Sequence, residues 1–144
     1  MQKNHLSSVT AVLPFKVEEV WQALINPDLV KKYFFGTILE TSWLPATPII
    51  FRGEWEGQSY MDKGTVLSFV PEESLSYSYL SSWSGLPDEP QNYLYVEYKL
   101  RVIDSGTELT ITQSNYDQEK ADHSAGNWEL LIEKMKEVLN AKSN

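Results

Sequence analysis

The sequence has no cysteine and only two histidines, His5 and His123, among its 144 residues. Without cysteine, a disulfide framework, thiolate ligands for a metal and a cysteine nucleophile are all excluded. The two histidines stand far apart in the chain and match neither HExxH nor another zinc spacing. We therefore expect no metal site and no cofactor.

Positive charge is also scarce. The chain has 12 Lys and Arg residues against 20 Asp and Glu residues, which gives a net charge of −8, and its longest basic run is the pair Lys31-Lys32. Nucleic acids and anionic lipid surfaces are bound by clustered Lys and Arg side chains. We therefore expect neither a nucleic acid nor a membrane as a partner.

Long apolar runs are missing as well. The run Ile49-Ile50-Phe51 is far shorter than the ~20 residues of a membrane-spanning helix, and the first residues do not have the pattern of a signal peptide. These absences predict a cytoplasmic protein. A chain of this length can bury a core without a disulfide or a metal, and no linker-like tract interrupts it, so we expect a single domain over residues 1–144.

Recognisable catalytic patterns are absent. Neither a G-x-S-x-G elbow nor a phosphate-binding P-loop occurs. The segment Gly53–Gly57 has carboxylates where a phosphate loop needs backbone donors and positive charge, and we interpret it as a strand connection. The pair Glu72-Glu73 lies in turn-like sequence, whereas general acid catalysis needs a carboxyl group in an apolar environment. No catalytic residue is predicted, and the sequence favours a non-enzymatic protein without excluding an enzyme.

The C-terminal segment Asp117–Lys142 predicts one long amphipathic helix. Its apolar residues recur at the i, i+3, i+4 and i+7 spacing that lines one helix face, and Asn115 or Asp117 is the expected N-cap. We interpret Gly126, inside this helix, as a point of close backbone approach. The apolar positions are Trp128, Leu131, Ile132, Met135, Val138 and Leu139.

The rest of the chain is mostly β-like, and two short helices interrupt it after the first strand. Alternation of apolar and polar residues predicts the strands. The helices are centred on Val17–Leu24 and Pro27–Phe34, with Asn26 as the N-cap of the second. This order predicts an α+β protein in which the terminal helix covers one face of a curved antiparallel sheet. The expected strands are His5–Leu13, Thr37–Trp43, Pro48–Arg52, Thr65–Val70, Leu75–Tyr79, Leu94–Val102 and Glu108–Thr112.

Residues at fixed places along this order carry a resemblance to a known family. They are Val17–Leu24, Asn26-Pro27, Tyr33, Gly36, Thr41–Trp43, Gly64–Val66, Pro71, Leu75, Gly106–Leu109 and Trp128. Together they resemble the domain called activator of heat-shock protein 90 ATPase homologue, C-terminal type, over nearly the whole chain. Two positions depart from the family pattern. Ala46 stands where many relatives have Gly in a turn, and Asn127 separates Gly126 from Trp128 where many have those two residues adjacent.

The family belongs to the Bet v 1-like, or START, helix-grip superfamily. The resemblance implies an antiparallel sheet of about seven strands that grips the long C-terminal helix around an apolar cavity. The chain has five Trp, eight Tyr and five Phe residues, which suit a packed core or the wall of such a cavity. The residues expected to line the cavity are Trp43, Phe51, Tyr77, Tyr79, Tyr98, Trp128, Leu131 and Met135.

Two classes of function are compatible with these features. The first is a binding module that holds an apolar or aromatic small molecule in the cavity without transforming it. The second is a cochaperone-like or stress-response protein that acts on a chaperone or another partner through its surface. A closed cavity favours the first class, and an exposed aromatic patch with an acidic rim favours the second. For an enzyme of the cyclase or hydrolase kind found elsewhere in the superfamily, the sequence offers no recognisable catalytic set.

Overall fold

The computed structural model describes residues 5–143. In this part of the chain, seven strands form one sheet in the order β1-β7-β6-β5-β4-β3-β2, and all neighbouring strands are antiparallel. The elements are β1 (His5–Leu13), α1 (Val17–Ile25), α2 (Pro27–Tyr33), β2 (Ile38–Thr41), β3 (Pro48–Trp55), β4 (Gln58–Val70), β5 (Ser74–Tyr79), the 3₁₀ turn η1 (Pro90–Asn92), β6 (Leu94–Ile103), β7 (Gly106–Asn115) and α3 (Gln118–Ser143). The α+β helix-grip architecture predicted from the sequence is confirmed.

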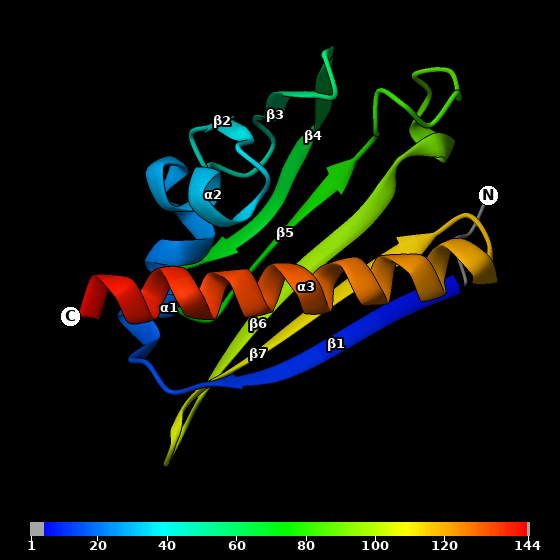
Figure 1. Ribbon diagram of the computed structural model, residues 1–144. Coiled ribbons are helices and arrows are strands. Elements are labelled where there is room, and N and C mark those ends of the chain that lie inside the picture. The colour runs from blue at the N-terminus through cyan, green and yellow to red at the C-terminus, as the bar shows by residue number, and fades with distance from the viewer. Residues whose placement is uncertain (1–4, 144) are drawn as a thin grey trace.

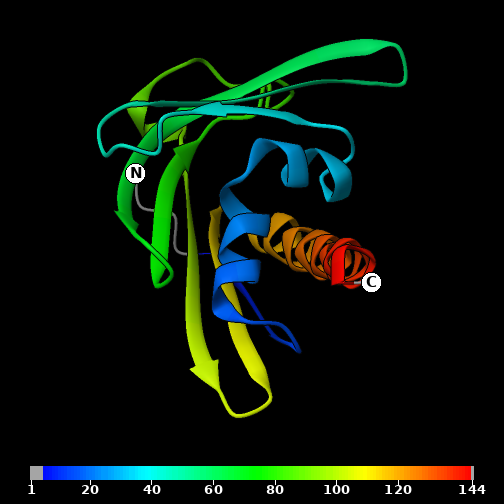
Figure 2. The same cartoon turned by 90° about the vertical axis from the view of Figure 1, so that its left-hand side faces the viewer.

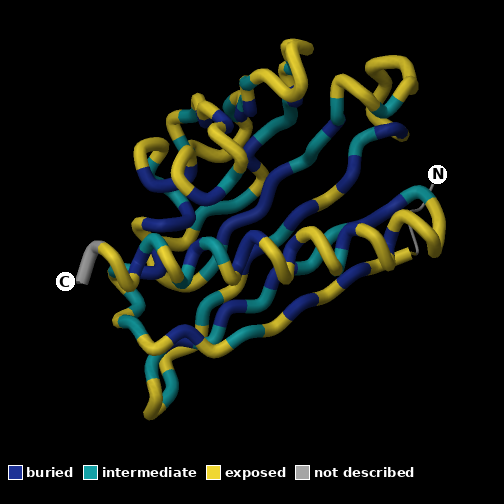
Figure 3. The backbone as a smooth tube through the Cα atoms, viewed as in Figure 1, coloured by how far each residue is buried: buried dark blue, intermediate teal, exposed yellow. Residues whose placement is uncertain are grey.

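The sheet is curved, and α3 lies against its concave face (Figure 1 and Figure 2). Helices α1 and α2 lie beside the C-terminal half of α3, with α2 next to β2 and α1 next to β6 and β7. One hydrophobic core fills the space between these helices and the sheet. Figure 3 shows buried positions concentrated beneath α3 and exposed positions at the tips of the hairpins and loops. The helix face and the concave sheet face therefore bury each other, as their periodicities predicted.

The N-terminus of α3 is fixed by Asp117. The Oδ1 atom of Asp117 accepts a hydrogen bond from the backbone N–H of Lys120 at 2.8 Å, which satisfies one of the free donors of the first turn. Asn115, the other expected cap, instead lies buried in β7 and donates from Nδ2 to the carbonyl oxygen of His5 at 3.0 Å. The predicted apolar face is buried at Trp128, Leu131, Ile132, Met135 and Leu139, and Val138 is partly buried.

One interpretation of α3 is wrong. A Cβ atom placed on Gly126 would have no neighbour within 4 Å, so this glycine does not mark a close backbone approach. It faces solvent, and its effect on the helix is the usual propensity cost of about 1 kcal/mol relative to alanine. Among the helices in residues 5–143, none combines the length and the apolar content that a membrane span requires.

Asn26 ends α1 and begins α2. Its Oδ1 accepts a hydrogen bond from the backbone N–H of Asp28 at 3.0 Å, and proline occupies the first position of α2, as predicted. The hydroxyl group of Tyr33, at the end of α2, donates to the carbonyl oxygen of Ala23 in α1 at 2.8 Å. This buried bond holds the two short helices together. Phe34, the next residue along the chain, is thereby kept against the core.

The strand boundaries between residues 37 and 70 differ from the prediction. The strand expected over Thr37–Trp43 is only Ile38–Thr41, because Trp43 has a left-handed φ of 60° that ends the extended backbone. The strand expected to end at Arg52 continues to Trp55. The next strand begins at Gln58, not at Thr65.

The segment Gly53–Gly57, interpreted from the sequence as a strand connection, connects β3 to β4 only through its last two residues. Gly53 pairs with Tyr60 and Trp55 pairs with Gln58, so the segment is mostly strand and only its last two residues turn the chain. Both turn residues have positive φ, 49° at Glu56 and 82° at the following glycine, which is the backbone of a type I′ hairpin turn. Pairing across this hairpin outweighs the low strand propensity of Gly and Glu.

Candidate functional site

Five aromatic side chains meet between α3 and the sheet, and we call them the interior aromatic cluster. Each comes from a different part of the fold: the end of α2, β3, β5, β6 and α3. Their ring centroids form a closed circle of contacts, with separations of 6.0, 5.5, 5.7, 5.7 and 6.2 Å around it. Most of these contacts are edge-to-face or tilted, as aromatic quadrupoles favour. In order around the circle, the members are Phe34, Phe51, Tyr77, Tyr98 and Trp128.

Two polar contacts lie within this apolar surrounding. The hydroxyl oxygens of Tyr77 and Tyr98 are 2.7 Å apart and fully inside the core, so one hydroxyl donates to the other. The hydroxyl that accepts keeps a proton of its own, and no acceptor for that proton is described in residues 5–143. The indole N–H of Trp128 donates to Oε1 of Gln113 at 2.7 Å. The cluster is therefore a packed group of aromatic rings that contains one hydroxyl proton without a described acceptor, and neither of the two described hollows includes any of its residues.

Burial is the main cause that raises the pKa values of Tyr33, Tyr77 and Tyr98 above the ordinary tyrosine value. The charges of neighbouring tyrosines raise these pKa values further, whereas the hydrogen bond with Tyr98 offsets part of the rise at Tyr77. Their neutral forms are strongly preferred, because an ionised phenolate would lack solvation in the core. All three hydroxyl groups are therefore hydrogen-bond donors throughout the physiological pH range.

We expect this arrangement to make the protein unfold in alkali. These tyrosines ionise near pH 10 in the unfolded chain but only at higher pH in the folded protein, so their contribution to stability is complete below about pH 10 and is lost above it. Above about pH 10, each should lower the free energy of unfolding by about 1.4 kcal/mol per pH unit. Urea denaturation across this range measures the slope, and Tyr98→Phe should reduce it by one tyrosine's share. Tyrosinate absorbance from all eight tyrosines in the folded protein near pH 10 would contradict this.

The structure places most of the other predicted residues next to the cluster. Tyr79 packs on Phe51 with ring centroids 5.7 Å apart, and Leu131 and Met135 are buried on the same face of α3 as Trp128. Whether these side chains contact a ligand stays a prediction.

Trp43 lies in a second aromatic group. Its ring stacks on Phe69 at 5.6 Å, Phe69 in turn contacts Trp21 of α1, and its indole N–H donates to the carbonyl oxygen of Ile25 at 3.1 Å. Sequence reasoning missed Phe34 and Gln113, which both contact Trp128. Phe34 packs on its ring, and Gln113 accepts its indole hydrogen bond. Val30, Tyr33 and Phe34 do follow the helical i, i+3, i+4 spacing, and this signal could have identified Phe34.

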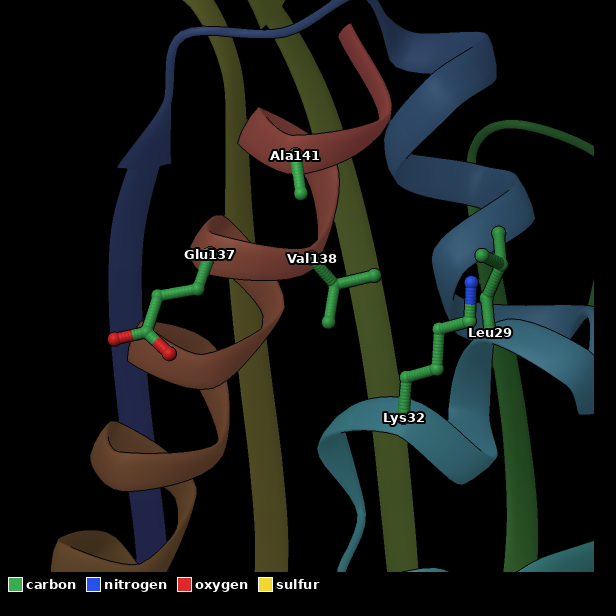
Figure 4. A pocket seen from close by; sticks show the side chains of 5 residues that line it. All are labelled: Leu29, Lys32, Glu137, Val138 and Ala141. Atoms are coloured by element: carbon green, nitrogen blue, oxygen red, sulfur yellow. The ribbon is translucent and has the colours of Figure 1, made fainter. Parts of the chain in front are cut away.

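A hollow of about 380 Å³ opens between α2 and α3 at the end of the core. Figure 4 shows its lining: Val138 and Leu29 face each other across it, the stem of Lys32 runs along one wall, and the carboxylate of Glu137 points away. Ala141 completes the lining. The hollow is therefore mostly apolar, with one amine at its rim.

A second hollow, of about 300 Å³, lies at the opposite end of the sheet. It is lined by Trp55 and Glu56 from the end of β3 and the turn, Gln58 from the start of β4, and Trp83 from the loop after β5. None of the eight residues predicted to line a cavity belongs to either hollow. These two hollows were not predicted.

Comparisons with known proteins agree with this architecture. The family model described as Activator of Hsp90 ATPase homolog 1-like protein matches residues 14–140. The solution structure of ChR145 from Cytophaga hutchinsonii is 37% identical to this chain with a TM-score of 0.84, and the match covers 99% of each chain. No curated protein matches the chain.

Two crystal structures show the same fold at lower identity. MLL2253 from Mesorhizobium loti is 20% identical with a TM-score of 0.77, over 94% of this chain and 97% of that one. NE0264 from Nitrosomonas europaea is 19% identical with a TM-score of 0.77, over 99% of each chain. Since the family match spans most of the sequence, and a relative with 37% identity shares the fold from end to end, the chain belongs to the Activator of Hsp90 ATPase homolog 1-like family and has its Bet v 1-like helix-grip fold.

Proposed function

We propose that the protein binds an apolar or aromatic small molecule between α3 and the sheet, at the interior aromatic cluster, without transforming it. The observation that carries the proposal is the hydroxyl pair of Tyr77 and Tyr98, 2.7 Å apart in the core. A buried donor without an acceptor costs about 1–3 kcal/mol, and a ligand carbonyl or ether oxygen would relieve this cost. The circle of aromatic rings would hold the flat part of the same ligand by stacking.

Such a ligand would enter from the hollow between α2 and α3. It is lined mainly by apolar side chains, and α2 ends at Tyr33, directly before the cluster residue Phe34. Phe34 contacts its two neighbours in the circle, Phe51 and Trp128. Displacement of this one side chain would open the circle from the α2 side. The cluster offers binding groups, whereas a nucleophile and base within reach of each other are not among them.

A pair of matched probes tests the proposal. Methyl naphthyl ketone and ethylnaphthalene have similar shapes, but only the ketone can accept a hydrogen bond. Both should raise the melting temperature, since a ligand at about 100 times its dissociation constant adds about 2.7 kcal/mol of stability. The ketone should bind about threefold to tenfold more tightly, which corresponds to one neutral hydrogen bond.

The control is the double variant Tyr77→Phe/Tyr98→Phe. Either single variant leaves one hydroxyl free to donate, so only the double variant removes the donor while keeping the rings. It should bind the two probes with equal affinity. Tyr95→Phe removes a hydroxyl group that is hydrogen-bonded to Glu97, on a residue that is 39% exposed, and it should keep the preference for the ketone. If neither probe changes the melting temperature of the wild-type protein, the proposed function is wrong.

A second candidate function is action on a chaperone or another protein through the surface. It is favoured by the three aromatic side chains that stay about half exposed at one end of the sheet, Phe35 (46%), Trp55 (51%) and Trp83 (53%), beside the carboxylate of Glu56. Exposed aromatic surface of this kind is typical of binding sites.

A further inference from the structure

Two tryptophans form the walls of the hollow at the tip of the β3–β4 hairpin. Trp55 is 51% exposed and Trp83 is 53% exposed, although tryptophan is the residue that gains most from burial. Each ring also has an aromatic partner: Phe35 and Trp55 are in edge-to-face contact at 6.0 Å, and Tyr60 and Trp83 are in edge-to-face contact at 5.2 Å. Neither partner lines the hollow itself.

The loop segment next to Trp83 is held in place by the buried carboxylate of Asp62. Oδ1 of Asp62 accepts hydrogen bonds from the backbone N–H of Ser82 at 2.8 Å and from its hydroxyl group at 3.1 Å, and Oδ2 accepts one from the hydroxyl group of Tyr79 at 2.5 Å. The neighbouring Trp83 is thus fixed beside β4 and rests on Tyr60. Both walls therefore exist before any ligand arrives.

The charge at the hollow is negative. Glu56 lines it, and no ion pair of Glu56 is described in residues 5–143. None of the four lining residues carries a positive charge, and the whole chain has a net charge of −8. The faces of indole rings attract cations more strongly than other aromatic rings do, especially cations that are poorly hydrated. Two exposed indole rings and one carboxylate around a hollow of about 300 Å³ suit a compact organic cation.

We infer that this hollow binds a small free organic cation of the quaternary ammonium type. The trimethylammonium head would lie between Trp55 and Trp83, near the carboxylate of Glu56, and the side-chain amide of Gln58 could contact a hydroxyl group of the same molecule. The inference does not rest on the proposed interior ligand, because no residue of the interior aromatic cluster lines this hollow.

Choline is the probe, and its neutral carbon isostere, in which a tert-butyl group replaces the trimethylammonium group, is the matched control ligand. The five indole N–H signals in a nitrogen-15 correlation spectrum give the readout. Choline should shift the signals of Trp55 and Trp83 with a dissociation constant of about 1 mM or lower, while the signals of Trp21, Trp43 and Trp128 stay in place. The isostere should bind at least about tenfold more weakly.

Variants separate the roles of the rings and the charge. Trp55→Leu or Trp83→Leu keeps apolar bulk but removes a ring face, and each should weaken choline binding about threefold to thirtyfold. Glu56→Asn should weaken it about twofold to fivefold without lowering the melting temperature, since Asn tolerates the left-handed backbone at this position. Glu72→Asn is the matched control: Glu72 also has a left-handed φ, 64°, but lies at the other end of β4. It should leave binding unchanged.

Three results would overturn the inference. Equal affinity for choline and its isostere would mean that the hollow recognises apolar bulk and not charge. Shifts of the Trp128 signal instead of Trp55 and Trp83 would place the probe at the interior cluster. Tighter binding of a peptide that carries one trimethyllysine would make a protein partner, and not a free molecule, the source of the cation. A failure of the ketone probe to bind inside the core, by contrast, leaves the choline result unaffected.

Discussion

The variant Gly64→Ala is expected to lose more than about 4 kcal/mol of stability, enough to unfold many proteins of this size. Gly64 lies inside β4, where the strand passes close to the end of β5. A Cβ atom on Gly64 would lie 1.6 Å from the carbonyl oxygen of Ser78 and 2.5 Å from its carbonyl carbon. Both are backbone atoms, so a change of side-chain rotamer cannot relieve the clash, and the two strands would have to separate. Urea denaturation followed by circular dichroism measures the loss.

Gly126→Ala is the control for this substitution. The same added methyl group meets nothing within 4 Å on α3, so the variant should gain about 1 kcal/mol from helix propensity. The two alanine variants should therefore move stability in opposite directions. A Gly64→Ala variant as stable as the wild-type protein would show that β4 and β5 do not approach each other as described.

The second large effect is expected for Leu131→Ala, which should lower the free energy of unfolding by about 2–5 kcal/mol. Leu131 is 4% exposed on the core face of α3. Its truncation removes buried apolar surface and leaves a space that rigid neighbours, the sheet and the aromatic cluster, cannot fill completely.

The neighbouring residue supplies an internal comparison. Leu130 is 47% exposed, and the same substitution there should cost less than about 1 kcal/mol. Helix propensity changes equally in the two variants, so the difference between them measures burial alone. Urea denaturation of both variants decides the point, and equal losses would mean that the orientation of α3 is wrong.

Sequence alone predicted the elements whose signals are local. The period of α3 was visible in the order of residues, as was the Asn26-Pro27 junction between α1 and α2, and Asp117 was one of the two caps expected for α3. The β3–β4 hairpin was not, because Gly53 and Glu54 have low strand propensity and pair only once the partner strand is present. From the sequence, Gly64 was interpreted as the residue that precedes a strand. Glycine is required at this position because the backbone of Ser78 lies too close for a Cβ atom. A contact with a residue this far along the chain is not visible in the local sequence.

The candidate sites also divide into parts with local sequence signals and parts that depend on contacts between distant segments. The apolar alternation in β5 and β6 and the helical period in α3 put Tyr77, Tyr98 and Trp128 on facing surfaces, so their convergence could be predicted. Trp43 was expected among them, but its left-handed backbone turns it toward α1. The surface hollow could not be predicted, because Trp55 and Trp83 belong to separate segments that only the sheet brings together.

The pairing of β1 with β7 determines when the sheet can be completed. His5 lies opposite Asn115, 110 residues along the chain, whereas β3 and β4, or β6 and β7, are joined by tight turns. Closing a long loop costs more chain entropy than closing a hairpin, so local hairpins can form early and long-range pairing is slow. During synthesis β1 leaves the ribosome before the other six strands of this sheet, and its partner β7 is the last of them to emerge. Until β7 has emerged, the apolar residues of β1 have no partner strand, and the nascent chain depends on its cellular surroundings to keep that segment from associating elsewhere.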